Sequence, residues 1–457
     1  MITMVFLLLL LLLALFLAAT GASAAVGLTE LVVLSLVFIV FFLSGIYVAA
    51  ALGMLALLAD LSFASRPIHP FIGQVAWNAS INFVLVAVPL FLLMGEILLR
   101  SGLSDRLYRA LNTWFGGLPG GLLHTNIVAC SIFSAVSGSS VATAATIGAV
   151  ALPYFDRTGY SPRLVLGSLA AGGALGNLIP PGITFIVYGL LTDTSVGKLY
   201  AAGFVAGFMV AALFMLFIFA YSLARTSYEA RSVIAWGARF KSLLDLLPTM
   251  LLIVLVLGTI YAGLATPTEA AALGVVGAVA LAAVSRRLTL PMLHASVRAT
   301  ARTTSMIGLI ILSAFALNFV LSRLRLPQTL ATMVTELALP PWVVMAIIIV
   351  FYIALGTFME GFSMMITTLP VVFPIVTALG YDPVWFGVIL TMLVEIALIS
   401  PPDGMVMYVL QGMRTRPGPI TDVFTGVLPF LGIYALGILL LMAFPRLVLW
   451  LPALMVR

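Results

Sequence analysis

The sequence predicts an all-α polytopic membrane protein built from two inverted repeats, each with a re-entrant helical hairpin and a discontinuous helix. The first observation is composition, because 63% of the residues are hydrophobic and only 8% are charged, whereas soluble proteins carry about 25% charged residues. The second is that two apolar stretches are each broken by a proline pair, at Pro180-Pro181 and Pro401-Pro402. The third is that these breaks and their surroundings recur at a fixed distance along the chain.

Composition also argues against several classes of function. The net charge of +6 does not indicate nucleic-acid binding, because the basic residues fall in short loops, where they set the orientation of membrane helices. A single cysteine, Cys130, allows no internal disulfide. His69, His124 and His294 lie far apart without ligand spacing, so we predict no transition-metal site and no cofactor.

The segment 1–27 is predicted to be signal-like or an extra N-terminal span. An apolar run is followed by Ala22-Ser23-Ala24, which resembles the cleavage site of a signal peptide, but no Lys or Arg precedes the run. A cleaved signal, an uncleaved span and a wrongly assigned start codon are three alternatives that the sequence leaves open.

Residues 28–222 are assigned to the first repeat. The serine-rich centre of the apolar segment 122–152 predicts a re-entrant hairpin or a pair of short helices. A helix over 165–178 is expected to stop at the proline pair and to resume over 183–191, because a residue before proline avoids the α conformation and proline suits a first helical turn. Glu96, near the end of a span, is expected to extend toward the membrane interface. The other predicted spans of this repeat are 30–59, 82–99 and 199–223.

Residues 223–245 form the longest polar segment and are predicted to be an amphipathic linker, which their basic excess places in the cytoplasm. The second repeat then occupies 246–457. Its apolar segments predict spans near 247–264, 268–284, 303–321, 341–355 and 423–449.

A shift of 221 positions places the first repeat on the second without a gap. Pro153 then meets Pro374, and Pro162 meets Pro383. The same shift pairs Thr146 with Thr367, Gly159-Tyr160 with Gly380-Tyr381, and Pro180-Pro181 with Pro401-Pro402. Two copies that each end in a Pro-interrupted segment are typical of secondary transporters, whose binding site lies at the repeat interface. Inverted topology of the copies is inferred from the count of their segments.

Small and hydroxyl-bearing residues surround the first break, in the runs 134–146 and 172–182. In lipid, a broken helix is tolerated where the freed backbone groups line a protected cavity. A break flanked by hydroxyls therefore predicts an ion and substrate site. The alternative is that these glycines and serines serve only close packing of helices. A matching second stretch over 356–412 favours the site.

Three acidic residues of the second stretch support the same interpretation. Glu360, Glu395 and Asp403 lie in otherwise apolar sequence, and ionisable groups within a membrane segment cost at least about 2.5 kcal/mol on insertion scales. Either they are functional or paired, or they lie near a hairpin tip in water. Because no Arg or Lys occurs in either motif, a bound cation is the expected counter-charge.

Four motifs resemble a known family: SGSSVATAATIGAVALPYFDRTGYSP, GSLAAGGALGNLIPPG, GTFMEGFSMMITTLPVVFPI and VEIALISPPDG. They are similar to the large membrane subunit of tripartite ATP-independent periplasmic (TRAP) transporters, over residues 28–450. The resemblance implies a mobile transport domain beside a scaffold domain, and sodium-coupled, elevator-type uptake of a small organic anion (a carboxylate) across the bacterial inner membrane. It also implies two partners, a periplasmic substrate-binding protein and a separate small four-helix membrane subunit.

The resemblance further implies two sodium sites, formed by backbone carbonyls and serine hydroxyls. The first comprises Ser134, Ser137, Gly176, Ile179 and Pro181, and the second comprises Gly356, Met359, Ala397, Ser400 and Asp403. The family often has Gly at the position of Ala397 and Thr at that of Ser400, and an acidic residue after the proline pair is unusual. The candidates for the substrate cavity are Ser139, Ser140, Thr143, Asn177, Thr184, Glu360 and Glu395.

The sequence thus predicts a carrier in which the half-helix N-termini after the two breaks face an anionic substrate. The first alternative is a stand-alone symporter of the same superfamily, which needs no binding protein. A membrane-embedded enzyme is disfavoured, because the sequence offers no nucleophile–base pair, HExxH motif or GxSxG motif with a histidine. A passive channel fits two Pro-broken copies less well than alternating access does. No residue identifies the substrate.

Overall fold

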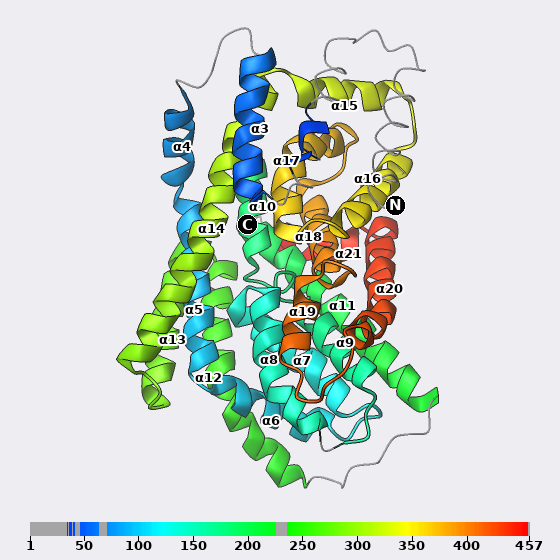
Figure 1. Ribbon diagram of the computed structural model, residues 1–457. Coiled ribbons are helices and arrows are strands. Elements are labelled where there is room, and N and C mark those ends of the chain that lie inside the picture. The colour runs from blue at the N-terminus through cyan, green and yellow to red at the C-terminus, as the bar shows by residue number, and fades with distance from the viewer. Residues whose placement is uncertain are drawn as a thin grey trace. The chain divides into compact units, whose positions relative to one another are not determined.

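The computed structural model describes residues 34, 36–38, 40–41, 46–63, 71–156, 158–224 and 235–455, and all regular structure in these ranges is helical (Figure 1). The elements are α3 (Val48–Phe63), α4 (Ile72–Ser80), the 3-10 helix η2 (Phe83–Val86), α5 (Ala87–Arg100), α6 (Leu103–Phe115), α7 (Leu122–Ser137), α8 (Ser140–Phe155), α9 (Pro162–Gly173), α10 (Ile183–Thr192), α11 (Val196–Ala224), α12 (Trp236–Tyr261), α13 (Pro267–Val284), α14 (Leu290–Arg323), α15 (Leu326–Glu336), α16 (Pro341–Gly356), α17 (Gly361–Ala378), α18 (Pro383–Ile399), α19 (Met405–Gly412), α20 (Thr421–Ala443) and α21 (Arg446–Leu454). This confirms the predicted all-α class, while the predicted N-terminal segment 1–27 lies outside the described residues.

Within the described ranges, seven helical segments are long and apolar enough to cross a membrane. They are Phe83–Arg100, Val196–Ala224, Trp236–Tyr261, Pro267–Val284, Leu290–Arg323, Gly361–Ala378 and Thr421–Ala443. Together with the composition, they identify a multi-pass membrane protein.

The serine-rich segment forms a pair of short helices, α7 and α8. Each has 16 residues, which at 1.5 Å per residue is about 24 Å and shorter than the hydrocarbon core of a bilayer. The chain reverses at Gly138, whose φ of 61° suits glycine and whose N–H donates to the Ser134 carbonyl over 3.1 Å. Ser139 then adopts an extended conformation and caps α8, its side chain accepting from the Ala142 N–H. The prediction of a hairpin or a pair of short helices is confirmed.

The helix after the hairpin is discontinuous, as predicted. α9 ends at Gly173, and α10 begins at Ile183, after the proline pair. In the second copy the corresponding gap is shorter, because α18 continues to Ile399 and α19 begins at Met405. The difference follows from sequence, since the first copy has three glycines (172, 173 and 176) where the second has Leu, Val and Ala, and glycine disfavours helix by about 1 kcal/mol. Both proline pairs have a cis peptide bond.

The helix boundaries recur at the shift that aligns the two copies in the sequence. This shift places the start of α8, Ser140, on the start of α17, Gly361. It also places the start of α9, Pro162, on the start of α18, Pro383. The ends of α7 and α16 keep this spacing to within two residues. The two copies therefore share a pattern of helices as well as a pattern of residues.

Contacts near the ends of the two broken helices show that these helices run in opposite directions. At one end, the loop before α9 meets the segment after α19, where the Thr415 hydroxyl donates to Asp156 over 2.9 Å and Arg416 pairs with the same carboxylate. At the other end, the end of α10 meets the start of α18, where the Tyr188 hydroxyl donates to the Pro383 carbonyl over 2.6 Å. The start of each broken helix thus lies beside the end of the other, which is the arrangement expected of inverted repeats.

Several predicted spans differ from the observed helices in their boundaries. The closing span, predicted over 423–449, is divided: α20 ends at Ala443 and α21 begins at Arg446, because Pro445 lacks the N–H that a continuing helix needs. α14 begins at Leu290, before the predicted 303. α12 begins at Trp236, so the final part of the segment predicted as a linker, 236–245, is helical, and residues 225–234 lie outside the described ranges.

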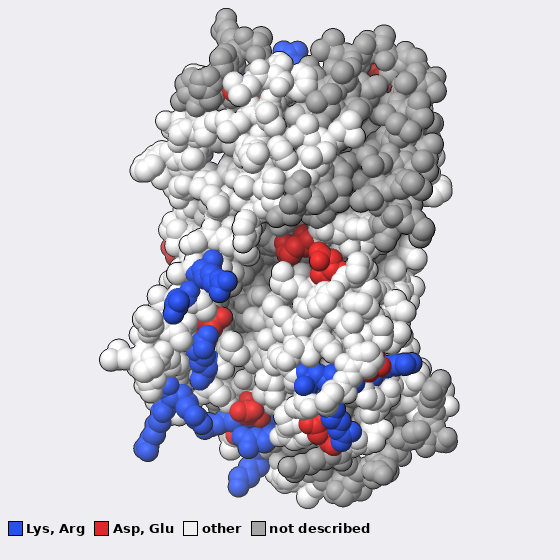
Figure 2. Space-filling model, in the orientation of Figure 1, with Lys and Arg blue, Asp and Glu red and all other residues white. Residues whose placement is uncertain are grey.

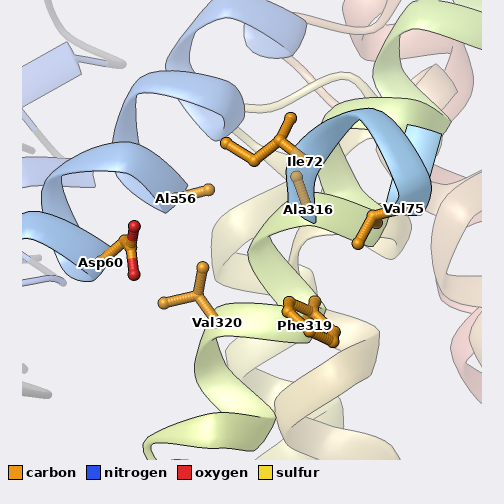
Figure 3. A pocket seen from close by; sticks show the side chains of 7 residues that line it. All are labelled: Ala56, Asp60, Ile72, Val75, Ala316, Phe319 and Val320. Atoms are coloured by element: carbon orange, nitrogen blue, oxygen red, sulfur yellow. The ribbon is translucent and has the colours of Figure 1, made fainter. Parts of the chain in front are cut away.

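By their contacts, the described residues form two compact units. One contains described parts of Met1–Asn82 with Met306–Ile348 and Ile366–Tyr381; the other contains Phe83–Ser305, Ile349–Met365 and Asp382–Arg457. In the first unit, α3, α4 and α14 line a small pocket of apolar side chains (Figure 3). Its one acidic lining residue is Asp60, which is 1% exposed. All the predicted site residues lie in the second unit.

α9 and α20 pack closely through two glycines, which provides a test of the fold. A Cβ on Gly167 would clash with the Gly426 carbonyl, and a Cβ on Gly426 would clash with the Arg163 carbonyl. Gly426→Ala should therefore lower the apparent melting temperature of the purified protein, because overpacking costs about 1–3 kcal/mol. Gly432→Ala, on the same helix with open space around it, is the control and should not lower it. Equal melting temperatures for the two variants would contradict this packing.

Candidate functional site

The tip of the first hairpin packs directly against the first break. A Cβ on Gly138 would lie 2.5 Å from the Pro181 carbonyl oxygen, so only glycine permits this approach. The Ile183 N–H, at the start of α10, donates to the Gly138 carbonyl over 3.3 Å. The sequence-predicted residues at the hairpin tip and at the proline pair are thereby brought together.

Hydroxyl groups lie buried on both sides of the hairpin tip. The Ser137 and Thr143 hydroxyls are 2.6 Å apart and link α7 to α8. The Ser134 hydroxyl donates to the Cys130 carbonyl over 2.7 Å, within α7. The Ser134 and Ser137 hydroxyls therefore already have protein partners.

The residues between α9 and α10 contact the start of α8. A Cβ on Gly176 would overlap the backbone of Ser139 and Ser140. Ile179 is fully buried and lies against Gly207 of α11.

The Thr184 hydroxyl, in the first turn of α10, is buried, with the residue 0% exposed, and has no hydrogen-bond partner among the described residues. An unsatisfied buried hydroxyl costs about 1–3 kcal/mol, so Thr184 is a candidate for direct contact with a bound ion or substrate.

Glu395 connects the second copy to the first break. Its side chain on α18 is 0% exposed, and it accepts hydrogen bonds from the Ser140 hydroxyl over 2.7 Å and from the Asn177 N–H over 3.2 Å. The Asn177 N–H and side-chain amide each donate to the Ser140 hydroxyl over 3.1 Å. Three predicted cavity residues therefore form one buried network.

The second predicted set is organised around the end of α16 and the end of α18. A Cβ on Gly356 would lie 2.7 Å from that of Ala397, so the two helix ends touch. Met359 is buried. The Ser400 carbonyl accepts from the Gly404 N–H over 2.9 Å, and the Pro402 carbonyl accepts from the Tyr408 hydroxyl over 2.7 Å. Asp403 lies in the short connection before α19, with its side chain exposed.

Glu360 has a local structural role that the sequence did not reveal. Its carboxylate accepts from the N–H groups of Phe362 and Ser363 over 3.0 and 2.8 Å and from the Ser363 hydroxyl over 3.0 Å. It thus caps α17 and satisfies amides that the helix leaves free. Its equivalent in the first copy is Ser139, which caps α8 by accepting a hydrogen bond from the Ala142 N–H. Ala142 is the residue equivalent to Ser363.

The two breaks differ in exposure and charge. Pro180 and Pro181 are buried, whereas Pro402 and Asp403 are exposed. Among the described ion pairs, none involves Glu360, Glu395 or Asp403. Figure 2 shows red acidic atoms among white ones near the middle of the visible face, and blue basic side chains to their left and in the lower part of the view. No described basic side chain neutralises these carboxylates.

Two aromatic residues that fix the broken helices against α20 were not predicted. The Tyr434 hydroxyl on α20 donates to the Ala174 carbonyl over 2.8 Å, where α9 ends. The indole N–H of Trp385 donates to the Leu441 carbonyl over 2.9 Å and fixes α18 against α20. A tyrosine or tryptophan within an apolar span needs a partner for its polar atom, which is the signal that could have drawn attention to both.

Residues 35–447 match the family described as "Tripartite ATP-independent periplasmic transporter, DctM component". The chain belongs to this family. It is 34% identical over 404 residues to the C4-dicarboxylate TRAP transporter large permease protein DctM of Pseudomonas aeruginosa, covering 88% of this chain and 93% of that protein. It is 31% identical over 374 residues to the sialic acid TRAP transporter large permease protein SiaM of Vibrio cholerae, covering 82% and 87%. It is also 31% identical over 376 residues to the ectoine TRAP transporter large permease protein TeaC of Halomonas elongata, again covering 82% and 87%.

Solved transporter structures share the fold of this TRAP family member. The YdaH transporter of Alcanivorax borkumensis aligns with a TM-score of 0.63 at 18% identity, over 91% of this chain and 99% of that one. MtrF of Neisseria gonorrhoeae aligns with a TM-score of 0.52 at 14% identity, over 85% of each chain. At such identities the likeness concerns the fold alone. The predicted family is confirmed, and the named relatives are transport permeases, which confirms the prediction of a transporter instead of an enzyme.

Proposed function

We propose that this chain is the large permease subunit of a TRAP transporter that couples sodium entry to uptake of a small organic anion. The observation that carries the proposal is the packing of the Gly138 hairpin tip against the Pro181 carbonyl, with buried hydroxyls on both sides. Backbone carbonyls and hydroxyls are the oxygen ligands that can replace the water around an alkali cation, and broken helices supply them at membrane depth.

The two predicted cation sites occupy equivalent places in the two copies. The shift that aligns the copies places Gly176 and Ile179 of the first set on Ala397 and Ser400 of the second. Ser134, Ser137 and Pro181 complete the first set, and Gly356, Met359 and Asp403 complete the second. We propose that a sodium ion at each site holds the hairpin and the break together. The mobile transport domain would then cross the membrane only when both sites are loaded.

The substrate would contact the half-helices that begin after the breaks. Their N-termini carry partial positive charge, which favours an anionic group, and the buried Thr184 hydroxyl lies in the first turn of α10. The relatives are named for C4-dicarboxylate, sialic acid and ectoine. These three compounds carry a carboxylate, whereas isethionate, for which a further relative is named, carries a sulfonate. An anionic group is thus common to all four, and we propose a small carboxylate as the substrate.

The remaining parts of the proposal concern movement, partners and location. Inverted repeats around a fixed site are the usual basis of alternating access. We propose an elevator movement of the transport domain. A small four-helix membrane subunit would brace the scaffold, and a periplasmic binding protein would deliver the substrate. The bacterial inner membrane is the location that these partners require.

Sodium dependence tests the proposal directly. The full complex, with small subunit and binding protein, is reconstituted in vesicles, and uptake of labelled substrate is measured under sodium, potassium or proton gradients. The substrate is first found by thermal-shift screening of the binding protein. We expect uptake with an inward sodium gradient and near-background uptake with the others. Uptake that is indifferent to sodium would refute the coupling.

The same assay separates the stand-alone symporter from the tripartite system. Vesicles that contain the two membrane subunits are tested with and without the binding protein. We expect uptake only when the binding protein is present. Equal uptake without it would identify a stand-alone symporter and overturn the proposed delivery step.

A further inference from the structure

Glu395 lies in the second repeat but contacts residues at the first break. We propose that Glu395 is a positioning residue, whose carboxylate holds Ser140 and Asn177 in the arrangement that the first cation site requires. This inference rests on the proposed function and assigns to Glu395 a role other than contact with substrate. It also implies that loading of the first site depends on a helix of the other repeat.

Hydrogen bonds link the three residues in a closed ring. The Ser140 hydroxyl donates to one carboxylate oxygen of Glu395 over 2.7 Å, and the Asn177 N–H lies 3.2 Å from the other. Asn177 also donates to the Ser140 hydroxyl from both its backbone and its side chain. Because every donor faces an acceptor, a carboxylate fits the ring better than an amide, which would direct an N–H toward one of these donors.

The ring adjoins residues of the proposed cation site. Asn177 follows Gly176 in the chain, and Gly176 packs against the Ser140 backbone so closely that a Cβ would overlap it. The Asn177 carbonyl in turn lies against Gly182, next to Pro181. A displacement of Ser140 or Asn177 would therefore move the backbone at Gly176 and Pro181, whose carbonyls are proposed ligands.

The ring has no equivalent at the second break. The residues at the positions equivalent to Glu395, Ser140 and Asn177 are Ala174, Gly361 and Leu398, none of which has a polar side chain. The network is thus specific to the first site, and this asymmetry supports a positioning role.

The experiment measures two quantities: the sodium concentration that gives half-maximal uptake and the substrate concentration that gives half-maximal uptake. Glu395→Gln, Ser140→Ala and the double variant are compared with the unmodified chain in the full reconstituted complex. We expect each single variant to raise the half-saturating sodium concentration by about tenfold, the scale of one hydrogen bond to a charged group. The double variant should show less than the product of the two single effects, because both changes disrupt the hydrogen bond between Ser140 and Glu395.

Asp382→Asn is the control for a general effect on α18. Asp382 caps the start of the same helix through the N–H groups of Val384 and Trp385, at the end of α18 opposite to the first break. Its sodium half-saturation should stay normal even where the melting temperature falls. If Glu395→Gln does not purify as a folded protein, Ser140→Ala decides the question by itself.

The possible outcomes separate this inference from the proposed function. Uptake by the unmodified chain that does not respond to sodium would refute the proposed function. A normal sodium response in the unmodified chain and in both single variants would overturn the positioning role alone. The positioning role would also be overturned if the rise in half-saturating sodium concentration in the double variant equalled the product of the two single effects. An equal rise in Asp382→Asn would overturn it as well.

Discussion

Gly176→Ala is expected to reduce sodium-driven uptake at least about a hundredfold, because there is no space for a methyl group at this position. A Cβ there would overlap backbone atoms of Ser139 and Ser140, and backbone cannot move aside as a flexible side chain can. The hairpin tip would be forced away from the break, and the carbonyls proposed as ligands would separate. Initial rates of uptake in reconstituted vesicles measure this effect.

Two control variants distinguish a local effect from loss of folding. Gly432→Ala lies in a helix with open space around it and should leave uptake unchanged. Ala397→Gly changes the equivalent residue of the second copy, where Gly356 already makes room for the existing methyl group, and it should lower uptake by less than about threefold. If Gly176→Ala retained most of its uptake while folded, the close packing of the hairpin on the first break would not matter for transport.

The positions of the breaks could be predicted from sequence because their causes are local. A proline pair interrupts a helix wherever it occurs, and the glycines near Gly173 account for the early end of α9. The serine-rich segment predicts short helices for a similar reason. The fixed shift between the copies extends these local inferences to the whole chain, and the starts of α8 and α17 keep that shift.

The roles of the acidic residues could not be predicted, because they depend on contacts between distant residues. Glu395 meets Ser140, which is 255 residues away, and nothing in the local sequence identifies this partner. Glu360 instead has partners two and three residues away. Its capping role could have been found by comparison with Ser139, the equivalent residue in the first copy. The exposure of Asp403 likewise depends on how the second break packs.

Glu360→Ala is expected to lower uptake by about thirtyfold, since it removes three hydrogen bonds at the start of α17. Without the cap, the first amides of α17 lose their acceptor next to the proposed second cation site. Glu360→Ser should restore most of the uptake, because serine performs the same task at residue 139 of the first copy. Uptake and sodium half-saturation are measured for both variants in the reconstituted complex.

Comparison of the two substitutions separates the hydrogen bonds of Glu360 from its charge. Serine keeps an acceptor for the helix amide and removes the carboxylate, whereas alanine removes both. If capping is the function of this residue, the serine variant transports with a near-normal sodium half-saturation. If the negative charge instead attracts the cation, serine and alanine are equally inactive, and Glu360→Asp is the variant that retains uptake. That second pattern would contradict the capping role and would assign Glu360 to the electrostatics of the second site.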